Sequence, residues 1–332
     1  MGAASSRRQV TRIDLGGSAP LRRQDTLTAE EPLEIRVGHR RGPRPPLAVT
    51  MRTPGDELDL ALGFLLTEGV ITHPSDVLTA QLCGDERKGT FVGSRQRDEQ
   101  RLSTLSVEEG HLLNASQVTG GSRPGIAPEP VGGGLLDARP PAGTYNVVDV
   151  VLADHVAPPD AGVERNFYTT SSCGVCGKAS IDAIRTRSRF DLAADPVTVG
   201  ARVLAGLPDR LRAAQRTFER TGGLHAAGLF TTAGELVAVR EDVGRHNAVD
   251  KLIGMQLRAG RLPLAGHVLL VSGRASFELT QKAWMAGISV MAAVSAPSTL
   301  AVDLAEEAGM TLVGFLRGQT MNVYAGQQRI LA

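Results

Sequence analysis

Two cysteines three positions apart are the residues of this sequence best suited to chemistry. Cys173 and Cys176 lie in residues 168–178, which read YTTSSCGVCGK, and glycines flank the pair. Two thiols at this spacing can form a disulfide, share a proton or pass a sulfur atom between them. Alone they are too few for a structural zinc ion, which takes four ligands. The pair is therefore a redox pair, a sulfur-handling pair or half of a metal site.

The surroundings of the pair favour a reactive thiol. Lys178 follows Cys176 by two residues, and residues 179–187 can begin a helix. A nearby cation and a helix N-terminus both lower the pKa of a thiol and raise the thiolate fraction. The thiolate is the form that attacks a sulfur donor, and a persulfide formed in this way is reversible. The third cysteine, Cys83, lies where an apolar stretch becomes polar, and we expect an inert buried thiol there.

A second candidate site lies in the loops that follow the expected strands of the C-terminal half. Arg245, Arg274 and Arg317 belong to three of these loops. Ligands of open α/β sheets bind beyond the carboxyl ends of the strands, and the N–H groups that open a helix favour anions. Guanidinium groups match phosphate oxygens. The three arginines therefore either converge on a phosphorylated ligand or are solvated loop residues, with Ser276 and Ser298 merely capping helices.

Two histidines adjoin these loops. His225 follows the glycine pair of the segment TGGLHAAG at 221–228, and His246 follows Arg245 at an expected helix start. Each is either a site residue or a structural histidine. The sequence contains neither the GxGxxG pattern nor a P-loop, so a standard dinucleotide fold is not expected.

Composition narrows the class of protein. The chain has 332 residues, 42% of them hydrophobic, and a net charge of +1. This balance argues against nucleic-acid binding driven by bulk charge. No apolar run approaches the roughly 18 residues of a membrane span, and no apolar segment follows Arg7 and Arg8 as a twin-arginine signal would require. We therefore expect a cytoplasmic protein with working thiols.

Pattern changes divide the chain into four parts. Residues 1–30 are polar and Arg-rich without periodicity, and we expect a disordered tail. Residues 31–84 together with 144–165 are expected to form a smaller N-terminal α+β domain. Residues 85–143 are rich in Gly, Ser, Arg, Glu and Pro, which predicts a disordered insertion. Residues 166–332 form the predicted α/β domain that carries the CxxC loop.

Strands and helices alternate through the second half of the chain. Strands are predicted at 235–239, 267–271, 289–294, 311–316 and 321–324, with helices between them that end near glycines. In the first half, strands are predicted within 33–51 and at 145–152, and a helix at 59–68. The alternation in the second half predicts a largely parallel sheet covered by helices.

Together these segments resemble one family, the formate dehydrogenase accessory sulfurtransferases (the FdhD/NarQ family). Six ordered blocks carry the resemblance: CGVCGK ending at Lys178, TGGLHAAG at 221–228, EDVGRHNAVDKLIG at 241–254, SGRASFELTQKAWMAG at 272–287, SAPSTLAVDLAEEAG at 295–309, and LVGFLRG with NVY near the C-terminus. Their number and order make the resemblance far more specific than a lone CxxC.

The resemblance implies a fold and an activity. The expected fold is α/β: a cytidine-deaminase-like three-layer C-terminal domain with a smaller β-containing N-terminal domain. Such proteins take persulfide sulfur from a cysteine desulfurase and pass it to the molybdenum or tungsten bis(molybdopterin guanine dinucleotide) cofactor. The sulfurated cofactor then enters formate dehydrogenase. The family also suggests a homodimer. From the charge and hydropathy we expect neither nucleic acid nor a membrane as partner, and we expect no resident metal.

The resemblance also assigns residues. The persulfide-bearing cysteine corresponds to Cys173, with Cys176 assisting. The stretch that contacts the cofactor corresponds to Phe315, Leu316, Arg317, Gly318, Gln319 and Thr320. It coincides with the last strand-end loop, so Arg245 and Arg274 are expected to line the same cofactor cleft.

Three other classes of function are alternatives to a sulfur carrier. A zinc deaminase needs H-x-E followed later by P-C-x-x-C, but alanines follow His225 and the cysteine pair precedes it. A zinc-stapled binding module would lose structure with a chelator. A thiol–disulfide oxidoreductase would depend on Cys176 as much as on Cys173, whereas a persulfide carrier depends more on Cys173.

Overall fold

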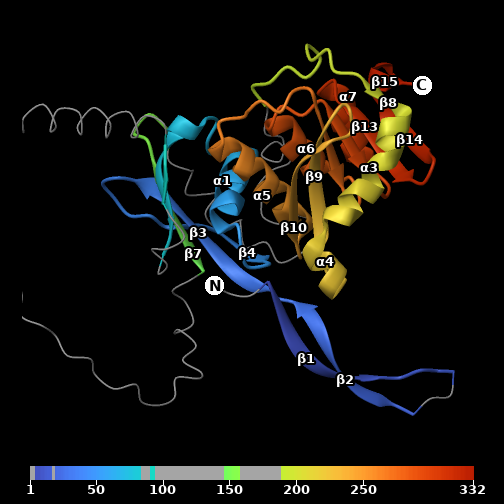
Figure 1. Cartoon of the computed structure of the whole chain (residues 1–332). Coiled ribbons are helices and arrows are strands. Elements are labelled where there is room, and N and C mark those ends of the chain that lie inside the picture. The colour runs from blue at the N-terminus through green and yellow to red at the C-terminus, as the bar shows by residue number, and fades with distance from the viewer. Residues whose placement is uncertain (1–3, 17–18, 84–89, 94–145, 158–187) are drawn as a thin grey trace, which may run out of the picture.

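The computed structural model describes residues 4–16, 19–83, 90–93, 146–157 and 188–332 (Figure 1). Two larger sheets organise these residues, and two smaller two-stranded sheets accompany them. The architecture is mixed α/β, as predicted. The CxxC segment lies outside the described residues, as do residues 94–143 of the predicted insertion.

The first larger sheet has five strands in the order β4-β3-β7-β5-β6. Their bounds are β3 Glu31–His39, β4 Pro46–Arg52, β5 Val77–Leu82, β6 Thr90–Val92 and β7 Val147–Leu152. Helix α1 (Glu57–Thr67) follows β4, and the short helix η1 (Pro74–Asp76) precedes β5. These bounds confirm the two strands predicted within 33–51, the helix predicted at 59–68 and the strand predicted at 145–152.

The second larger sheet has six strands in the order β10-β9-β11-β12-β13-β14. Their bounds are β9 His225–Thr231, β10 Leu236–Asp242, β11 His267–Val271, β12 Val290–Ala293, β13 Thr311–Arg317 and β14 Thr320–Ala325. Only β11–β12 and β12–β13 pair in parallel, and the other three pairs are antiparallel.

The prediction of a largely parallel sheet is therefore wrong. Strand β9 inserts between β10 and β11, and its sequence, HAAGLFT, lacks the β-branched run that signals a strand. It is a buried central strand whose small residues fit between neighbours, so neither alternation nor propensity reveals it.

Helices cover both faces of this sheet, which gives three layers. The bounds are α3 Ala201–Ala214, α4 Arg216–Thr221, α5 Arg245–Arg258, α6 Phe277–Met285 and α7 Thr299–Glu307. One apolar cluster joins residues of α5, α6 and α7 to one face of the sheet and extends to α1 and the five-stranded sheet. A second cluster joins Leu204, Leu207 and Leu211 of α3 to the opposite face. A small parallel pair, β8 (Val199–Gly200) with β15 (Ile330–Leu331), lies beside α3.

Two glycines let α1 and α5 pack at unusually close range. A Cβ on Gly63 would lie 1.9 Å from the carbonyl oxygen of Asp250, and one on Gly254 would lie 1.8 Å from that of Asp59. No side chain fits at either position without moving a backbone. This contact joins the five-stranded sheet, through α1, to the six-stranded sheet.

A buried ion pair reinforces the same junction. Lys282 of α6 donates to both carboxylate oxygens of Asp250 on α5, at 2.9 and 3.0 Å, and to the hydroxyl of Thr67 on α1 at 2.8 Å. Thr67 in turn donates to Asp250 at 2.8 Å. Burial alone would lower the pKa of Lys282, but the charges of Asp250 and Glu68 outweigh it and raise that pKa, so the lysine stays charged. The pair holds three helices together.

Residues 1–30 do not form the disordered tail that was predicted. Strands β1 (Ser5–Arg12) and β2 (Leu21–Thr28) form an antiparallel ribbon with eight paired positions. The ribbon projects from the body of the molecule (Figure 1), so both its faces meet solvent and neither carries an apolar alternation. A strand without a buried face leaves no hydrophobic period in the sequence.

The predicted disordered insertion also begins too early. Thr90–Val92 form β6, which pairs antiparallel with β5, so at least these residues belong to the five-stranded sheet. Among the described helices, none combines the length and apolar character that crossing a bilayer requires.

Candidate functional site

The carboxyl ends of four strands and the start of a fifth meet at one edge of the six-stranded sheet. Asp242 at the end of β10 pairs with His225 at the start of β9, and Val271 at the end of β11 pairs with Ala227. The parallel pairs continue this edge through β12 to β13. Ligands of α/β sheets bind at such an edge. We call it the strand-end edge, which comprises His225 and residues 242–246, 272–276, 295–298 and 315–320.

The three arginines predicted to bind a phosphorylated ligand all lie at the strand-end edge. Arg245 is the first residue of α5, Arg274 follows β11, and Arg317 is the last residue of β13. Arg245 follows β10, Arg274 follows β11 and Arg317 ends β13, and one other strand lies between β10 and β11 and between β11 and β13. At about 4.8 Å between neighbouring strands, they span roughly 19 Å. They are thus spread along one edge, which suits an elongated anionic ligand better than a single phosphate.

His225 places a neutral imidazole among these cations. Burial lowers the pKa of His225, and the charges of Arg245 and His246 lower it further, against the opposing effect of Asp242. A Cβ added to Gly273 would lie 3.6 Å from Nδ1 of His225, so the ring faces the loop after β11. A neutral ring at this position can both donate and accept a hydrogen bond.

A buried carboxylate fixes the start of α5. Asp242 is fully buried and lies 2.7 Å from the amino group of Lys251. It also accepts the backbone N–H of Gly244 at 2.8 Å and that of Thr53 at 3.1 Å, while Lys251 donates to the Thr53 carbonyl at 2.8 Å. These contacts tie the loop that presents Arg245 to the end of β4.

A second acidic residue, Glu278, lies beside the strand-end edge and was not predicted as a site residue. Glu278, in the first turn of α6, lies 3.9 Å from Nε2 of His246. Burial alone would raise the pKa of Glu278, but His246, Ser276 and its own backbone N–H lower it to about 2. An acidic residue in the first turn of a helix, directly after a strand-end loop, is the signal that could have identified it.

The loops after β11 and β12 support each other. The backbone N–H of Ser295 donates to Gly273 at 3.2 Å, Ala275 donates to Ala296 at 3.2 Å, and Ser298 donates back to Ala275 at 3.0 Å. Between these anchored positions the Arg274 side chain is exposed. The loops therefore hold their backbone while presenting a cation to solvent.

The stretch expected to contact the cofactor has an unusual backbone. Phe315 has φ 50°, a left-handed conformation that a non-glycine residue seldom adopts, and Gly318 has φ 56°. The pairing of β13 with β14 shifts register between Gly314 and Arg317. The Arg317 guanidinium carbon lies 5.4 Å from the Phe315 ring centroid, and Arg317, Gly318, Gln319 and Thr320 are exposed. The turn therefore presents a cation next to an aromatic ring to solvent, whereas Leu316 is buried.

The predicted catalytic residues Cys173 and Cys176, with Lys178, lie outside the described residues, so their position relative to the edge stays a prediction. Cys83 is described and only partly buried. Burial raises the pKa of its thiol, and Asp149 raises it further, which disfavours the thiolate. This agrees with the inert thiol predicted for Cys83, although the burial is incomplete.

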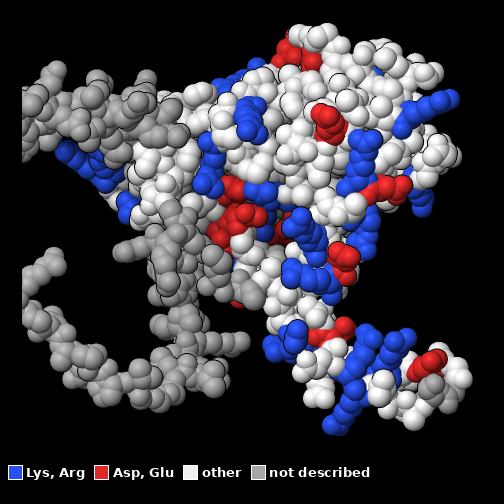
Figure 2. All heavy atoms as spheres, viewed as in Figure 1, with Lys and Arg blue, Asp and Glu red and all other residues white. Residues whose placement is uncertain are grey.

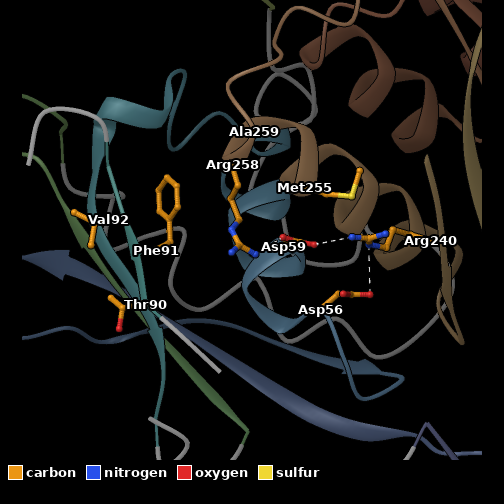
Figure 3. Close-up of a pocket in the computed structure, with 9 residues that line it drawn as sticks. All are labelled: Asp56, Asp59, Thr90, Phe91, Val92, Arg240, Met255, Arg258 and Ala259. Atoms are coloured by element: carbon orange, nitrogen blue, oxygen red, sulfur yellow. Dashed lines mark hydrogen bonds and ion pairs between the residues drawn. The ribbon is translucent and has the colours of Figure 1, made fainter. Parts of the chain in front are cut away.

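A hollow of about 710 Å³ lies between β6 and the C-terminal part of α5 (Figure 3). Asp59 of α1 accepts from Arg240 at 3.1 Å and from Arg258 at 2.6 Å, and Arg240 lies 3.4 Å from Asp56. Phe91 forms part of its wall. The two carboxylates form ion pairs with the two guanidiniums, so the charges here join α1 to α5 and β10. The partners are 181 to 199 residues apart along the chain, beyond the reach of sequence pattern.

Comparison with known proteins identifies the family. The FdhD/NarQ family model matches residues 28–121 and 144–331. The chain belongs to the FdhD/NarQ family. It is 52% identical over 331 residues to the sulfur carrier protein FdhD of Streptomyces avermitilis, covering 99% of this chain and 97% of that protein. It is 50% identical over 330 residues to the sulfur carrier protein FdhD of Mycobacterium tuberculosis, covering 99% of this chain and all of that protein.

A solved structure shares the fold. The crystal structure of a putative formate dehydrogenase accessory protein from Desulfotalea psychrophila matches with a TM-score of 0.62 at 18% identity, covering 99% of this chain and 100% of that one. The mixed α/β architecture therefore recurs at low sequence identity.

Proposed function

We propose that this FdhD/NarQ member is a sulfur carrier needed for formate dehydrogenase. One observation carries the proposal: relatives called sulfur carrier protein FdhD are about half identical to it over nearly their whole length. In the proposed cycle it accepts sulfur from a cysteine desulfurase. It then passes the sulfur to Mo-bis(molybdopterin guanine dinucleotide), which is the substrate, before that cofactor enters formate dehydrogenase.

The proposed chemistry begins at Cys173. Its thiolate attacks the outer sulfur of the desulfurase persulfide, a new S–S bond forms on Cys173, and the desulfurase cysteine leaves as a thiolate. When Cys176 then attacks Cys173, a disulfide closes, the sulfur passes to the cofactor as sulfide and the two thiols supply the two electrons, so a dithiol reductant must reduce the disulfide before the next round. The protein is in this sense a sulfurtransferase that acts as an accessory carrier and cofactor chaperone.

The strand-end edge is the proposed cofactor site. Arg245, Arg274 and Arg317 supply cations along an edge long enough for a dinucleotide with several phosphates. The turn from Phe315 to Thr320 adds four exposed residues, 317–320, at the end of this edge. The three layers around this edge also agree with the cytidine-deaminase-like assignment proposed for residues 166–332.

The proposed setting is a cytoplasmic homodimer that meets two proteins in turn, the desulfurase and the dehydrogenase. A thiol–disulfide oxidoreductase and a zinc-stapled module remain the alternatives for the CxxC pair. They differ in what Cys173 carries after contact with a sulfur donor.

Incubation with a cysteine desulfurase and cysteine, without reductant, tests the proposal. Peptide mass spectrometry should find one added sulfur atom on Cys173 of the wild-type protein and none in Cys173→Ser. Cys176→Ser is the matched control, because a carrier still loads sulfur on Cys173 without it. Tightly bound zinc with no sulfur adduct would overturn the proposal in favour of a structural metal site.

A further inference from the structure

The ribbon formed by β1 and β2, residues 5–28, is a surface that the proposed sulfur-transfer chemistry does not use. We call it the arm. The family model begins to match at residue 28, the last residue of the arm, whereas relatives about half identical to this chain align over nearly all of it. Two-stranded ribbons are marginally stable alone in water, and a third strand or a packing partner normally stabilises them.

The arm is strongly basic. It contains five exposed arginines, all in its two strands, and two acidic residues, Asp14 and Asp25, a net charge of +3 in a chain whose total is +1. Figure 2 shows this concentration of basic side chains along the projecting ribbon. The exposed arginines are Arg7, Arg8, Arg12, Arg22 and Arg23. Because this charge is concentrated in one projecting segment, it affects the binding of a partner more than the solubility of the protein.

Pairing places these residues on two different faces. Because side chains alternate along each strand, Arg7 and Arg22 share one face with glutamines and threonines. Arg8, Arg12 and Arg23 share the other face with exposed aliphatic side chains. These are Leu21, which is 62% exposed, and Leu27, which is 42% exposed.

This composition fits a protein partner. Interfaces between proteins are enriched in arginine and depleted in lysine, and the arm contains no lysine. Within the part of the chain that the structure describes, each strand of this two-stranded sheet has one edge without a strand beside it, and such edges accept an added strand. Aliphatic side chains among the arginines add contacts that a polyanion such as nucleic acid does not use.

The root of the arm lies next to the strand-end edge. Thr28 donates a hydrogen bond to Thr221 of α4 at 2.9 Å, and a Cβ on Gly223 would lie 3.0 Å from the Thr28 hydroxyl. His225, which opens β9 at the edge, follows two residues later. Exposed Arg216 and Arg220 of α4 lie beside this root. A protein held by the arm is therefore brought to the edge where the cofactor is proposed to bind.

We propose that the arm docks an acidic surface of the formate dehydrogenase that receives the cofactor. The identity of this partner rests on the proposed function, whereas its chemistry follows from the arm: clustered carboxylates with apolar side chains between them. The arm holds the formate dehydrogenase while the strand-end edge releases the cofactor.

The test compares two variants of the full-length protein that lose the same charge. The arm variant is Arg7→Gln/Arg8→Gln/Arg22→Gln/Arg23→Gln. The control is Arg40→Gln/Arg41→Gln/Arg202→Gln/Arg261→Gln, which removes four exposed arginines elsewhere. Affinity for the cofactor-free formate dehydrogenase of the same genome is measured at low and high salt.

We expect the arm variant to bind at least about tenfold more weakly at low salt and to lose most of the salt dependence, while the control binds like wild type. A third variant with lysine at the same four arm positions keeps the charge and should recover part of the affinity. Recovery by lysine shows that charge, not a misfolded ribbon, is responsible.

Sulfur loading on Cys173 separates this proposal from the proposed function. If wild type loads sulfur and binds the dehydrogenase, but the arm variant binds equally well, the arm proposal is overturned and the carrier function stands. If wild type fails to load sulfur, the carrier function fails whatever the arm does. If the arm variant lost affinity for duplex DNA or anionic vesicles but bound the dehydrogenase as well as wild type does, the arm proposal would also be overturned.

Discussion

Charged residues do opposite work in two regions of this molecule. At the junction of α1, α5 and α6, Asp250 and Lys282 are buried and fully engaged with each other. At the strand-end edge, Arg274 and Arg317 are exposed, although their loops are anchored by backbone hydrogen bonds or a tight turn. Charges at the junction therefore hold elements together, whereas charges at the edge stay available for a ligand.

The largest effect is expected at the buried ion pair. Lys282→Met leaves the Asp250 carboxyl group buried without its cation, which should lower the free energy of unfolding by about 3–5 kcal/mol in urea titration. The double variant Lys282→Met/Asp250→Leu removes both charges and should recover much of this loss. A single variant as stable as wild type would mean that the pair does not hold the junction.

A smaller loss is expected from filling the close contact between α1 and α5. Gly254→Ala places a methyl group 1.8 Å from the Asp59 carbonyl oxygen and should cost about 1–3 kcal/mol. Gly206→Ala in α3 is the matched control, because no atom lies within 4 Å of its added methyl group. That change should stabilise by about 0.5–1 kcal/mol through helix propensity. Equal effects in thermal unfolding would contradict the close contact.

The smallest stability effect is expected at the edge itself, at low pH. The pKa of Glu278 is about 2 in the folded protein and ordinarily 4.5, so its contribution is fully present above pH 4.5 and is lost as pH falls towards 2. Because Glu278 is only partly buried, solvent screening limits the contribution to about 1 kcal/mol. Stability measured from pH 5 to 2.5 should fall less steeply in Glu278→Gln than in wild type. Parallel curves would show that His246 does not stabilise the carboxylate.

The same contrast explains what sequence could predict. Strands β11, β12 and β13 are apolar runs bounded by polar loops, so their positions and the shared edge with Arg274 and Arg317 could be predicted. Asp250 and Lys282 read as ordinary surface charges of amphipathic helices, and nothing local says that the folded chain brings them together. The strands of the arm were not predicted, because a ribbon exposed on both faces has no hydrophobic period in its sequence. Phe315 gave no signal either, because its left-handed backbone is imposed by the β13–β14 turn and not by its residue type.

The central claim, that the strand-end edge binds the anionic nucleotide part of the cofactor, is tested most directly by calorimetry with guanosine diphosphate. This probe carries the guanine and two phosphates of one end of the proposed substrate. Arg317→Gln should weaken its binding by about tenfold or more, the loss expected for a charge-assisted hydrogen bond, while the exposed control Arg261→Gln should bind like wild type. Equal affinity of wild type and Arg317→Gln for guanosine diphosphate would contradict the account.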